Sequence, residues 1–153
     1  MNIIDIQRVC ESQNQPSDAQ LELWVNMVLA NLDEEFEITI RIVDESESTQ
    51  LNENYRHKKG ATNILSFPFE VPEGIELNLL GDLVICAPVL EREAIEQNKP
   101  LHNHWAHIVI HGTLHLLGYD HIENAEAEKM ETKEINFLQT LSIPNPYETD
   151  IEL

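Results

Sequence analysis

The sequence predicts a single α/β (α+β) domain in which a mixed sheet of roughly four strands carries helices packed on its faces. Three observations favour this class. The 153 residues have the length of one ordinary domain, and 42% of them are apolar, which is enough to build a core without disulfide or metal staples. Segments with the two-residue period of strands alternate with segments of helical period. No repeat or linker divides the chain, so we expect one domain over residues 1–153.

Strand-like and helical segments alternate in the first half of the chain. Ser17 and Gln20 form a capping box, which indicates the start of an amphipathic helix. Ile38, Ile40 and Ile42 alternate with polar residues, as in a half-buried strand. The predicted elements are a strand over residues 1–9, a helix that ends at about Leu32, a strand over 36–43 and a surface helix over 46–55.

The second half adds two strands and three helices. Pro68 follows the first of these strands, and because proline cannot donate to a sheet ladder we expect that strand at or near an edge. Pro88 suits the first turn of a helix. Gly118 is expected to end a later, long helix over 103–117. Asp120 and Glu123 form a capping signal for the last helix. The predicted elements are strands over 62–67 and 82–87 and helices over 88–97, over 103–117 and from Asp120 onward, in the order β-α-β-α-β-β-α-α-α.

The chain is strongly acidic. Nine Lys and Arg residues stand against 28 Asp and Glu residues, a formal net charge of −19, which argues against a protein that coats duplex DNA through many phosphate contacts. No signal-peptide pattern begins the sequence, and no apolar run approaches the roughly 20 residues of a membrane span. We therefore expect a cytoplasmic protein with no membrane partner.

Histidines provide the main chemical signal, because six of the seven lie between His102 and His121. On a helix, His111 and His115 lie on one face with Cβ atoms about 5–6 Å apart, close enough for both rings to bind one ion. Gly118 then turns the chain, so that His121 can return as a third ligand. Three histidines with an open fourth position are typical of catalytic zinc, and we expect one Zn²⁺ per chain. The alternative is that these are ordinary histidines with hydrogen-bond partners.

The neighbours of these three histidines are expected to have lesser roles. His107 continues the stripe one turn earlier and is expected to support the ligands or to pack beside them. His102 is expected in the loop before the helix and His104 at the start of the helix, both as residues without a ligand role. Asp120 is expected to cap the last helix or to support one of the histidine ligands.

The residue at position 112 bears on the class of reaction. Zinc peptidases of the H-E-x-x-H pattern carry a general-base Glu directly after the first His, and this place holds Gly112. The predicted helix over 103–117 contains no Asp or Glu, so a conventional peptidase mechanism lacks its proton acceptor, whereas a metal-activated water can still act as the nucleophile. Gly112 also permits close packing of the helix on the sheet.

Three of the nine cationic residues lie in the segment Arg56-His57-Lys58-Lys59. A solvated loop is one interpretation of such a run. The guanidinium of Arg56, however, suits the charge that develops on phosphoryl oxygens during phosphodiester cleavage, and a peptide carbonyl needs no such group. We therefore expect Arg56 to be catalytic, a phosphate ester to be the substrate, and Lys58 to be a candidate substrate contact.

The residues from His111 to His121, HGTLHLLGYDH, resemble the signature of the YbeY-type endoribonucleases, bacterial factors for ribosomal RNA maturation. The run T-N-I-L-S-F-P over 62–68, the run L-G-D-L over 80–83 and the segment LNENYR over 51–56 also resemble the family pattern. The resemblance covers roughly residues 35–135. One departure is that Gly60-Ala61 stands where family members commonly have Arg-Pro. Gly60 lacks the positive charge of that arginine, so we expect fewer basic contacts with RNA beside the site.

The resemblance implies a single-strand-specific, metal-dependent endoribonuclease that acts in 3′-end maturation of small-subunit ribosomal RNA and in ribosome quality control. It implies that His111, His115 and His121 bind the metal and that Arg56 is functional, with Ser66 as a further candidate for contact with the substrate or support of the site. The implied partners are single-stranded ribosomal RNA and the small ribosomal subunit with its proteins. Because an acidic chain makes few phosphate contacts, we expect a partner to present the RNA.

Two other classes of function stay open. One is a metallohydrolase of another bond, such as an amide, which cleavage of a labelled peptide but not of RNA would favour. The other is a ribosome assembly factor without catalysis, whose metal only joins the helix to the following loop. Full biological rescue by a metal-retaining but cleavage-dead Arg56→Ala variant would favour that class.

Overall fold

A four-stranded sheet forms the centre of the computed structural model, which describes residues 2–10, 12–30, 32, 34–69, 78–119 and 123–147. The strand order is β1-β2-β4-β3. β1, β2 and β4 are parallel, and β3 is antiparallel to β4. The mixed sheet is thus confirmed, and the strand that ends at Pro68 lies at the sheet edge as predicted. The strands are β1 (Ile3–Arg8), β2 (Glu37–Val43), β3 (Ile64–Pro68) and β4 (Leu79–Cys86).

The helices follow the predicted order, with boundaries that shift by a few residues. The Ser17 capping box is present at the start of the first helix, and proline lies in the first turn of the third. The predicted surface helix over 46–55 is an α-helix that continues directly into a π-helical segment. The helices are α1 (Asp18–Leu29), α2 (Glu45–Leu51), the π-helix η1 (Asn52–Arg56), α3 (Ala87–Glu96), α4 (Leu101–Leu116) and α5 (Asn124–Thr140).

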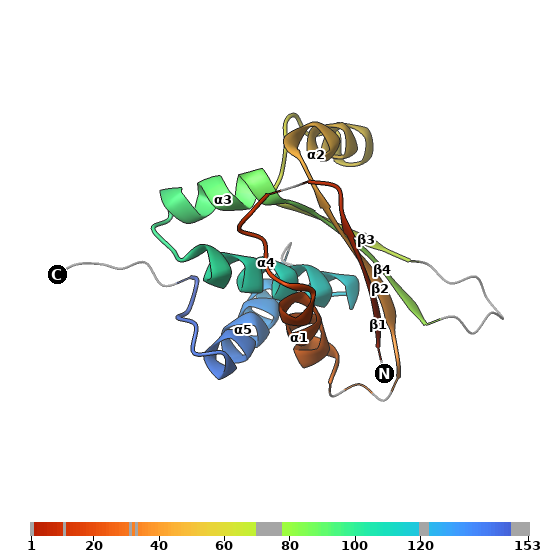
Figure 1. Ribbon diagram of the computed structural model, residues 1–153. Coiled ribbons are helices and arrows are strands. Elements are labelled where there is room, and N and C mark those ends of the chain that lie inside the picture. The colour runs from red at the N-terminus through yellow and green to blue at the C-terminus, as the bar shows by residue number, and fades with distance from the viewer. Residues whose placement is uncertain are drawn as a thin grey trace.

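Helices lie on both faces of the sheet (Figure 1). α1 and α4 cover one face and α5 packs against α4, so the main core lies between these helices and the sheet, with Trp24 and Trp105 buried in it. α2 lies on the other face, over a smaller apolar cluster that includes Leu65 and Val84. No helix in the described parts of the chain is both long and apolar enough to cross a membrane.

α4 is held close to the sheet by its glycine. A Cβ added at Gly112 would lie 2.5 Å from Ile64 Cδ1 and 2.9 Å from Leu83 Cδ2, so the backbone of α4 packs directly on β3 and β4. The packing interpretation of Gly112 is therefore confirmed. A glutamate of the H-E-x-x-H pattern has no room here without displacing core side chains, and overpacking of this kind is destabilising.

The end of α4 is a Schellman turn. Gly118 has φ +103°, a left-handed conformation that favours glycine, and its N–H donates to the carbonyl of His115 at 3.0 Å. The N–H of Tyr119 donates to the carbonyl of Leu114 at 3.2 Å. These two bonds define the motif and confirm that Gly118 ends the helix.

The predicted start of the last helix is wrong. α5 begins at Asn124, and its N-cap is Glu123, which makes no capping bond with its side chain. Glu123 has φ −95° and ψ 142°, an extended conformation that prevents the helix from beginning one turn earlier at Asp120. Asp120 and His121 themselves lie outside the described residues.

Candidate functional site

Three histidines form a row along one face of α4. The ring centroids of His107 and His111 are 6.2 Å apart, and those of His111 and His115 are 6.4 Å apart with planes only 9° from parallel. All three side chains are half-buried. The helical spacing therefore places the rings side by side, as the sequence predicts.

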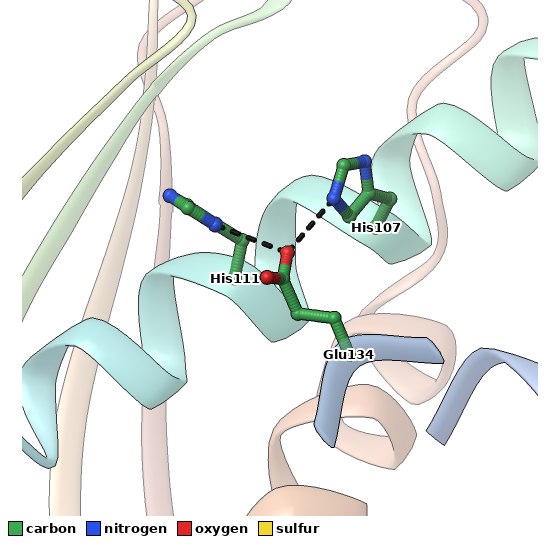
Figure 2. Close-up of side chains that lie close together, drawn as sticks. All are labelled: His107, His111 and Glu134. Carbon is green, nitrogen blue, oxygen red and sulfur yellow. Dashed lines mark hydrogen bonds and ion pairs between the residues drawn. The ribbon is translucent and has the colours of Figure 1, made fainter. Parts of the chain in front are cut away.

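A carboxylate from another helix completes this row. Glu134 of α5 extends between His107 and His111 (Figure 2) and is fully buried. Its Oε1 lies 2.8 Å from His107 Nε2 and 3.0 Å from His111 Nδ1. The Tyr147 hydroxyl donates to the same carboxylate, at 2.9 Å to Oε1 and 3.0 Å to Oε2. Three donors from two segments of the chain thus satisfy one buried carboxylate.

Sequence reasoning missed Glu134. The signal was an acidic residue inside the apolar stripe of the last helix, because Glu134 lies at helical spacing between Met130 and Leu138. All three side chains have zero exposure, and an ionised carboxylate is almost never buried unless it is paired. The prediction that α4 itself carries no carboxylate is correct, but α5 supplies one.

The pKa shifts in this cluster are consistent with a negatively charged Glu134 carboxylate. Burial by itself raises the pKa of Glu134, but hydrogen bonds from His107 and His111, together with their charges, lower that pKa to about 2. Burial lowers the pKa of His107 against the opposing effect of Glu134, so its imidazole is neutral near pH 7. Burial and the adjacent Glu134 charge raise the pKa of Tyr147, so its hydroxyl stays protonated and donates.

These contacts determine which nitrogen of two histidines can bind a metal. A carboxylate at Nδ1 of His111 holds a proton on that nitrogen, and His115 Nδ1 lies 2.9 Å from the carbonyl oxygen of Tyr119, which accepts its proton. In the neutral form of each ring, the lone pair then lies on Nε2. Metal-binding histidines characteristically donate their other N–H to a carboxylate or a backbone carbonyl. The donor set of His111 and His115 therefore fits a metal ion.

A second grouping of ligand atoms shares His111. One ligand atom each from His107, His111 and Glu134 lies within 4.8 Å of the others, so these three residues also form a possible metal-binding group. The contacts at 2.8 and 3.0 Å within it have the length of hydrogen bonds. Two ligands of a tetrahedral zinc, each bonded at about 2.0–2.1 Å, would stand farther apart, at roughly 3.3 Å.

The other predicted residues lie at different distances from this row. Arg56 and Lys58 are exposed on η1 and the loop that follows it, which leads into β3. Ser66 lies on the edge strand β3 and pairs with Leu83 of the neighbouring strand β4. Both residues are on the sheet face against which α4 packs. His104 lies in the first turn of α4 as predicted, 2.9 Å from Glu93. His102, expected in the loop before the helix, also lies in this turn, because α4 begins at Leu101, and it contacts the Trp24 ring edge-on.

Replacing Glu134 with Gln is expected to weaken metal binding by about 10- to 100-fold, because the amide keeps the shape but loses the charge that orients His111. Competition with a chromophoric zinc chelator measures this. Glu93→Gln is the matched control, since it weakens the comparable Glu93–His104 pair and should leave metal affinity unchanged. Complete loss of the ion in Glu134→Gln would instead make Glu134 a direct ligand.

Fold and site together define a mixed α/β protein with a histidine-rich candidate metal centre on one helix. The family model described as endoribonuclease YbeY matches residues 6–142. The chain belongs to this family. The match extends further toward both termini than the motifs recognised in the sequence.

Individual relatives agree with this assignment. The chain is 57% identical over 155 residues to an endoribonuclease YbeY from Alteromonas mediterranea, an alignment that covers 97% of this chain and 98% of that protein. It is 55% identical over 150 residues to an endoribonuclease YbeY from Colwellia psychrerythraea, covering 95% and 97% of the two chains. The solution structure of a Thermotoga maritima protein matches with a TM-score of 0.61 at 22% identity, over 96% of this chain and 100% of that one, and shows the same fold.

Proposed function

We propose that this protein is a zinc-dependent endoribonuclease, one domain over residues 1–153, that cleaves single-stranded RNA. The observation that carries the proposal is the pair of contacts at Nδ1 of His111 and of His115, because they direct Nε2 of both rings to metal binding. Membership of the endoribonuclease YbeY family supports RNA as the substrate. The same membership supports a role in 3′-end maturation of small-subunit ribosomal RNA and in ribosome quality control.

His111 and His115 would hold the zinc, with His121 as the third ligand. A bound zinc supplies Lewis-acid activation of water and charge stabilisation. Glu134, with Tyr147 behind it, holds the His111 ring in one orientation and keeps its proton on Nδ1. The Tyr119 carbonyl does the same for His115, so the site is preorganised before metal or substrate binds.

Arg56 would stabilise the charge of the scissile phosphate. It lies at the end of η1, and the chain runs from there into edge strand β3, on which α4 packs through Gly112. A guanidinium contacts phosphoryl oxygens through two parallel hydrogen bonds. Lys58 follows in the same exposed segment and is proposed as a further phosphate contact, and Ser66 on β3 as a polar contact with the substrate.

The test of this function is RNA cleavage by protein of known metal content. We expect cleavage of RNA with single-stranded segments, loss of cleavage after chelation, and recovery when zinc is restored. A labelled peptide cleaved in place of RNA would support the alternative metallohydrolase. Rescue of ribosome maturation in cells by a cleavage-dead variant that retains its metal would support an assembly factor without catalysis.

The net charge of −19 predicts weak binding to free RNA. The logarithmic salt slope for single strands is about −0.7 per neutralised phosphate, so two or three contacts from Arg56, Lys58 and Lys59 give a slope of about −1.4 to −2.1. We expect the same RNA segment to be cleaved faster when the small ribosomal subunit presents it. Cleavage rates of that segment, free and in the subunit, at two salt concentrations measure this. Tight binding to free RNA with a slope steeper than about −5 would contradict it.

A further inference from the structure

A cavity of about 620 Å³ lies beside the histidine row. Its walls come from three places in the chain: the loop between α3 and α4, the first two turns of α4, and the segment that follows α5. Its volume is in the range of sites that bind small molecules. We refer to it as the α4 cavity. The proposed function above does not use it.

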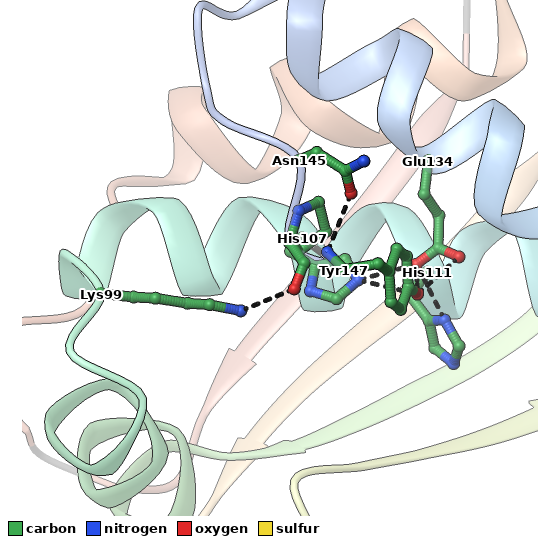
Figure 3. A network of polar contacts seen from close by, with 7 residues as sticks. Lys99, His107, His111, Glu134, Asn145 and Tyr147 are labelled. Atoms are coloured by element: carbon green, nitrogen blue, oxygen red, sulfur yellow. Dashed lines mark hydrogen bonds and ion pairs between the residues drawn. The ribbon is translucent and has the colours of Figure 1, made fainter. Parts of the chain in front are cut away.

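His107 joins the α4 cavity to the candidate metal centre. Its ring lines the cavity, while its Nε2 contacts Glu134, whose Oε1 also contacts His111. Figure 3 shows His107 with Lys99 on one side and with Glu134 and His111 on the other. His107 and His111 are one helical turn apart, about 6 Å along α4, which corresponds to roughly two stacked nucleotides at about 3.4 Å each. A strand whose phosphate lies at the histidine row would therefore bring a neighbouring nucleotide to this cavity.

The charge of the lining suits a nucleic acid. None of the described residues that line the cavity is Asp or Glu, although the chain has 28 of them. Lys99 is the cation of the lining, and its Nζ donates to the Pro146 carbonyl at 3.3 Å. Burial lowers the pKa of Lys99 against the opposing charge of Glu93, and an anion in the cavity would favour its charged form.

The remaining side chains match the faces and edges of a nucleobase. Four amide side chains line the cavity, and each offers a donor and an acceptor side by side, the pattern with which Asn and Gln bind the edge of adenine. The side-chain oxygen of Asn145 already accepts the N–H of Tyr147 at 2.8 Å, which fixes that amide in place. Three prolines supply apolar walls. The amides are Gln97, Asn98, Asn103 and Asn145, and the prolines are Pro100, Pro144 and Pro146.

We propose that the α4 cavity binds one unstacked nucleotide of the single-stranded RNA substrate, with its base among the amide side chains and its phosphate near Lys99. This inference rests on the proposed function for the identity of the strand. It makes the cavity a subsite that selects RNA with an unpaired base close to the cleaved bond. A base held in a helix could not enter it.

Binding of a mononucleotide tests the cavity without any cleavage. We expect adenosine monophosphate to shift the side-chain amide NMR signals of Asn103 and Asn145, and ribose 5-phosphate to shift them far less. Asn103→Leu, which fills the cavity from α4, should abolish the shift at Asn145. Asn136→Leu, an exposed site on α5, is its control. Equal shifts from both ligands, or none, would overturn the proposal.

Lys99→Gln provides a second variant, so that the test does not depend on the folding of Asn103→Leu. It should weaken binding of adenosine monophosphate and of ribose 5-phosphate alike, because it removes the cation and leaves the amides. Lys129→Gln, on the exposed side of α5, is the matched control and should change neither. Unchanged phosphate binding in Lys99→Gln would overturn the assignment of the phosphate to this side of the cavity.

Cleavage of a substrate series then connects the cavity to the reaction. Single nucleotides near the cut are replaced in turn by abasic ribose. At one position we expect KM to rise by about 5- to 150-fold, the range for loss of one base contact, with little change in kcat. In Asn103→Leu the same abasic substitution should not raise KM further. In the control Asn136→Leu it should raise KM as much as in the parent protein. If the abasic substitution raises KM in Asn103→Leu as much as in the parent, the subsite is refuted. If the parent protein does not cleave RNA, the proposed function is refuted, and binding of the mononucleotide alone decides whether the cavity is a nucleotide site.

Discussion

His115→Ala is expected to lower metal occupancy from about one ion per chain toward zero and to abolish RNA cleavage. The reason is that the Tyr119 carbonyl accepts the Nδ1 proton of this ring, which leaves Nε2 as the atom proposed to bind the metal. His111→Ala should have the same effect. Elemental analysis of the purified variants measures occupancy, and circular dichroism should show that they remain folded, because the core of Trp24, Trp105 and their neighbours is complete without the metal.

Two further variants separate this centre from its alternatives. His102→Ala removes a histidine from the same helix that packs edge-on against Trp24, and it should keep its ion. His107→Ala should also keep most of its ion, because His107 contacts Glu134 and lies outside the proposed ligand set. If His107→Ala loses the ion and His115→Ala retains it, then the metal lies in the group of His107, His111 and Glu134.

Arg56→Ala is expected to lower the rate of RNA cleavage by about 10²–10³, the usual cost of losing one donor to the charge of the transition state. Metal content and folding should be unchanged, since the side chain is exposed on η1. Arg56→Lys should recover only part of the rate, because lysine keeps the charge but lacks the planar pair of donors. Single-turnover cleavage of one RNA segment compares the three proteins.

Arg92→Ala is the matched control for Arg56. Arg92 is also an exposed arginine, but it lies on α3 and pairs with Glu45. Its loss removes the same charge from the protein without touching η1, so cleavage should be close to that of the parent. Equal activity in Arg56→Ala and the parent would remove Arg56 from the mechanism, and an equal loss in both variants would make the effect one of net charge.

Gly112 and Glu134 both bear on how this site differs from that of the zinc peptidases. The sequence lacks the glutamate of the zinc peptidases at that place, and the close approach of Ile64 and Leu83 explains why. Glu134 does not substitute for it. Its carboxylate contacts His111 at Nδ1, the nitrogen opposite to Nε2, so it would orient the proposed ligand and is not positioned as a base for a water at the proposed metal.

Local patterns predicted what depends on neighbours along the chain. The capping box of Ser17, the edge position of the strand before Pro68 and the turn at Gly118 each follow from the conformational limits of one or two residues. The spacing of His111 and His115 places their rings on one face of any helix. The contact between His115 and the Tyr119 carbonyl is also local, because the turn at Gly118 brings that carbonyl back to the end of the helix.

The start of α5 shows where a local pattern fails. Asp120 and Glu123 have the spacing of a capping box, but Glu123 itself has an extended conformation and the helix begins at Asn124. Propensities are weak compared with tertiary contacts. The buried face of α5, with Met130, Glu134 and Leu138 against α4, is consistent with packing having determined where this helix begins.

The sequence by itself therefore determined the order of the elements and the histidine row on α4. Only the tertiary structure decided that Glu134 lies between His107 and His111, that Tyr147 donates to it, and that a cavity with no Asp or Glu among its described lining residues opens beside Lys99. These residues are 23 or more positions apart in the pairs Glu134–His111, His107–Tyr147 and Lys99–Pro146. Helical periodicity specifies which face of α5 is buried, but the partner of each side chain on that face depends on how α5 and the segment after it pack across α4.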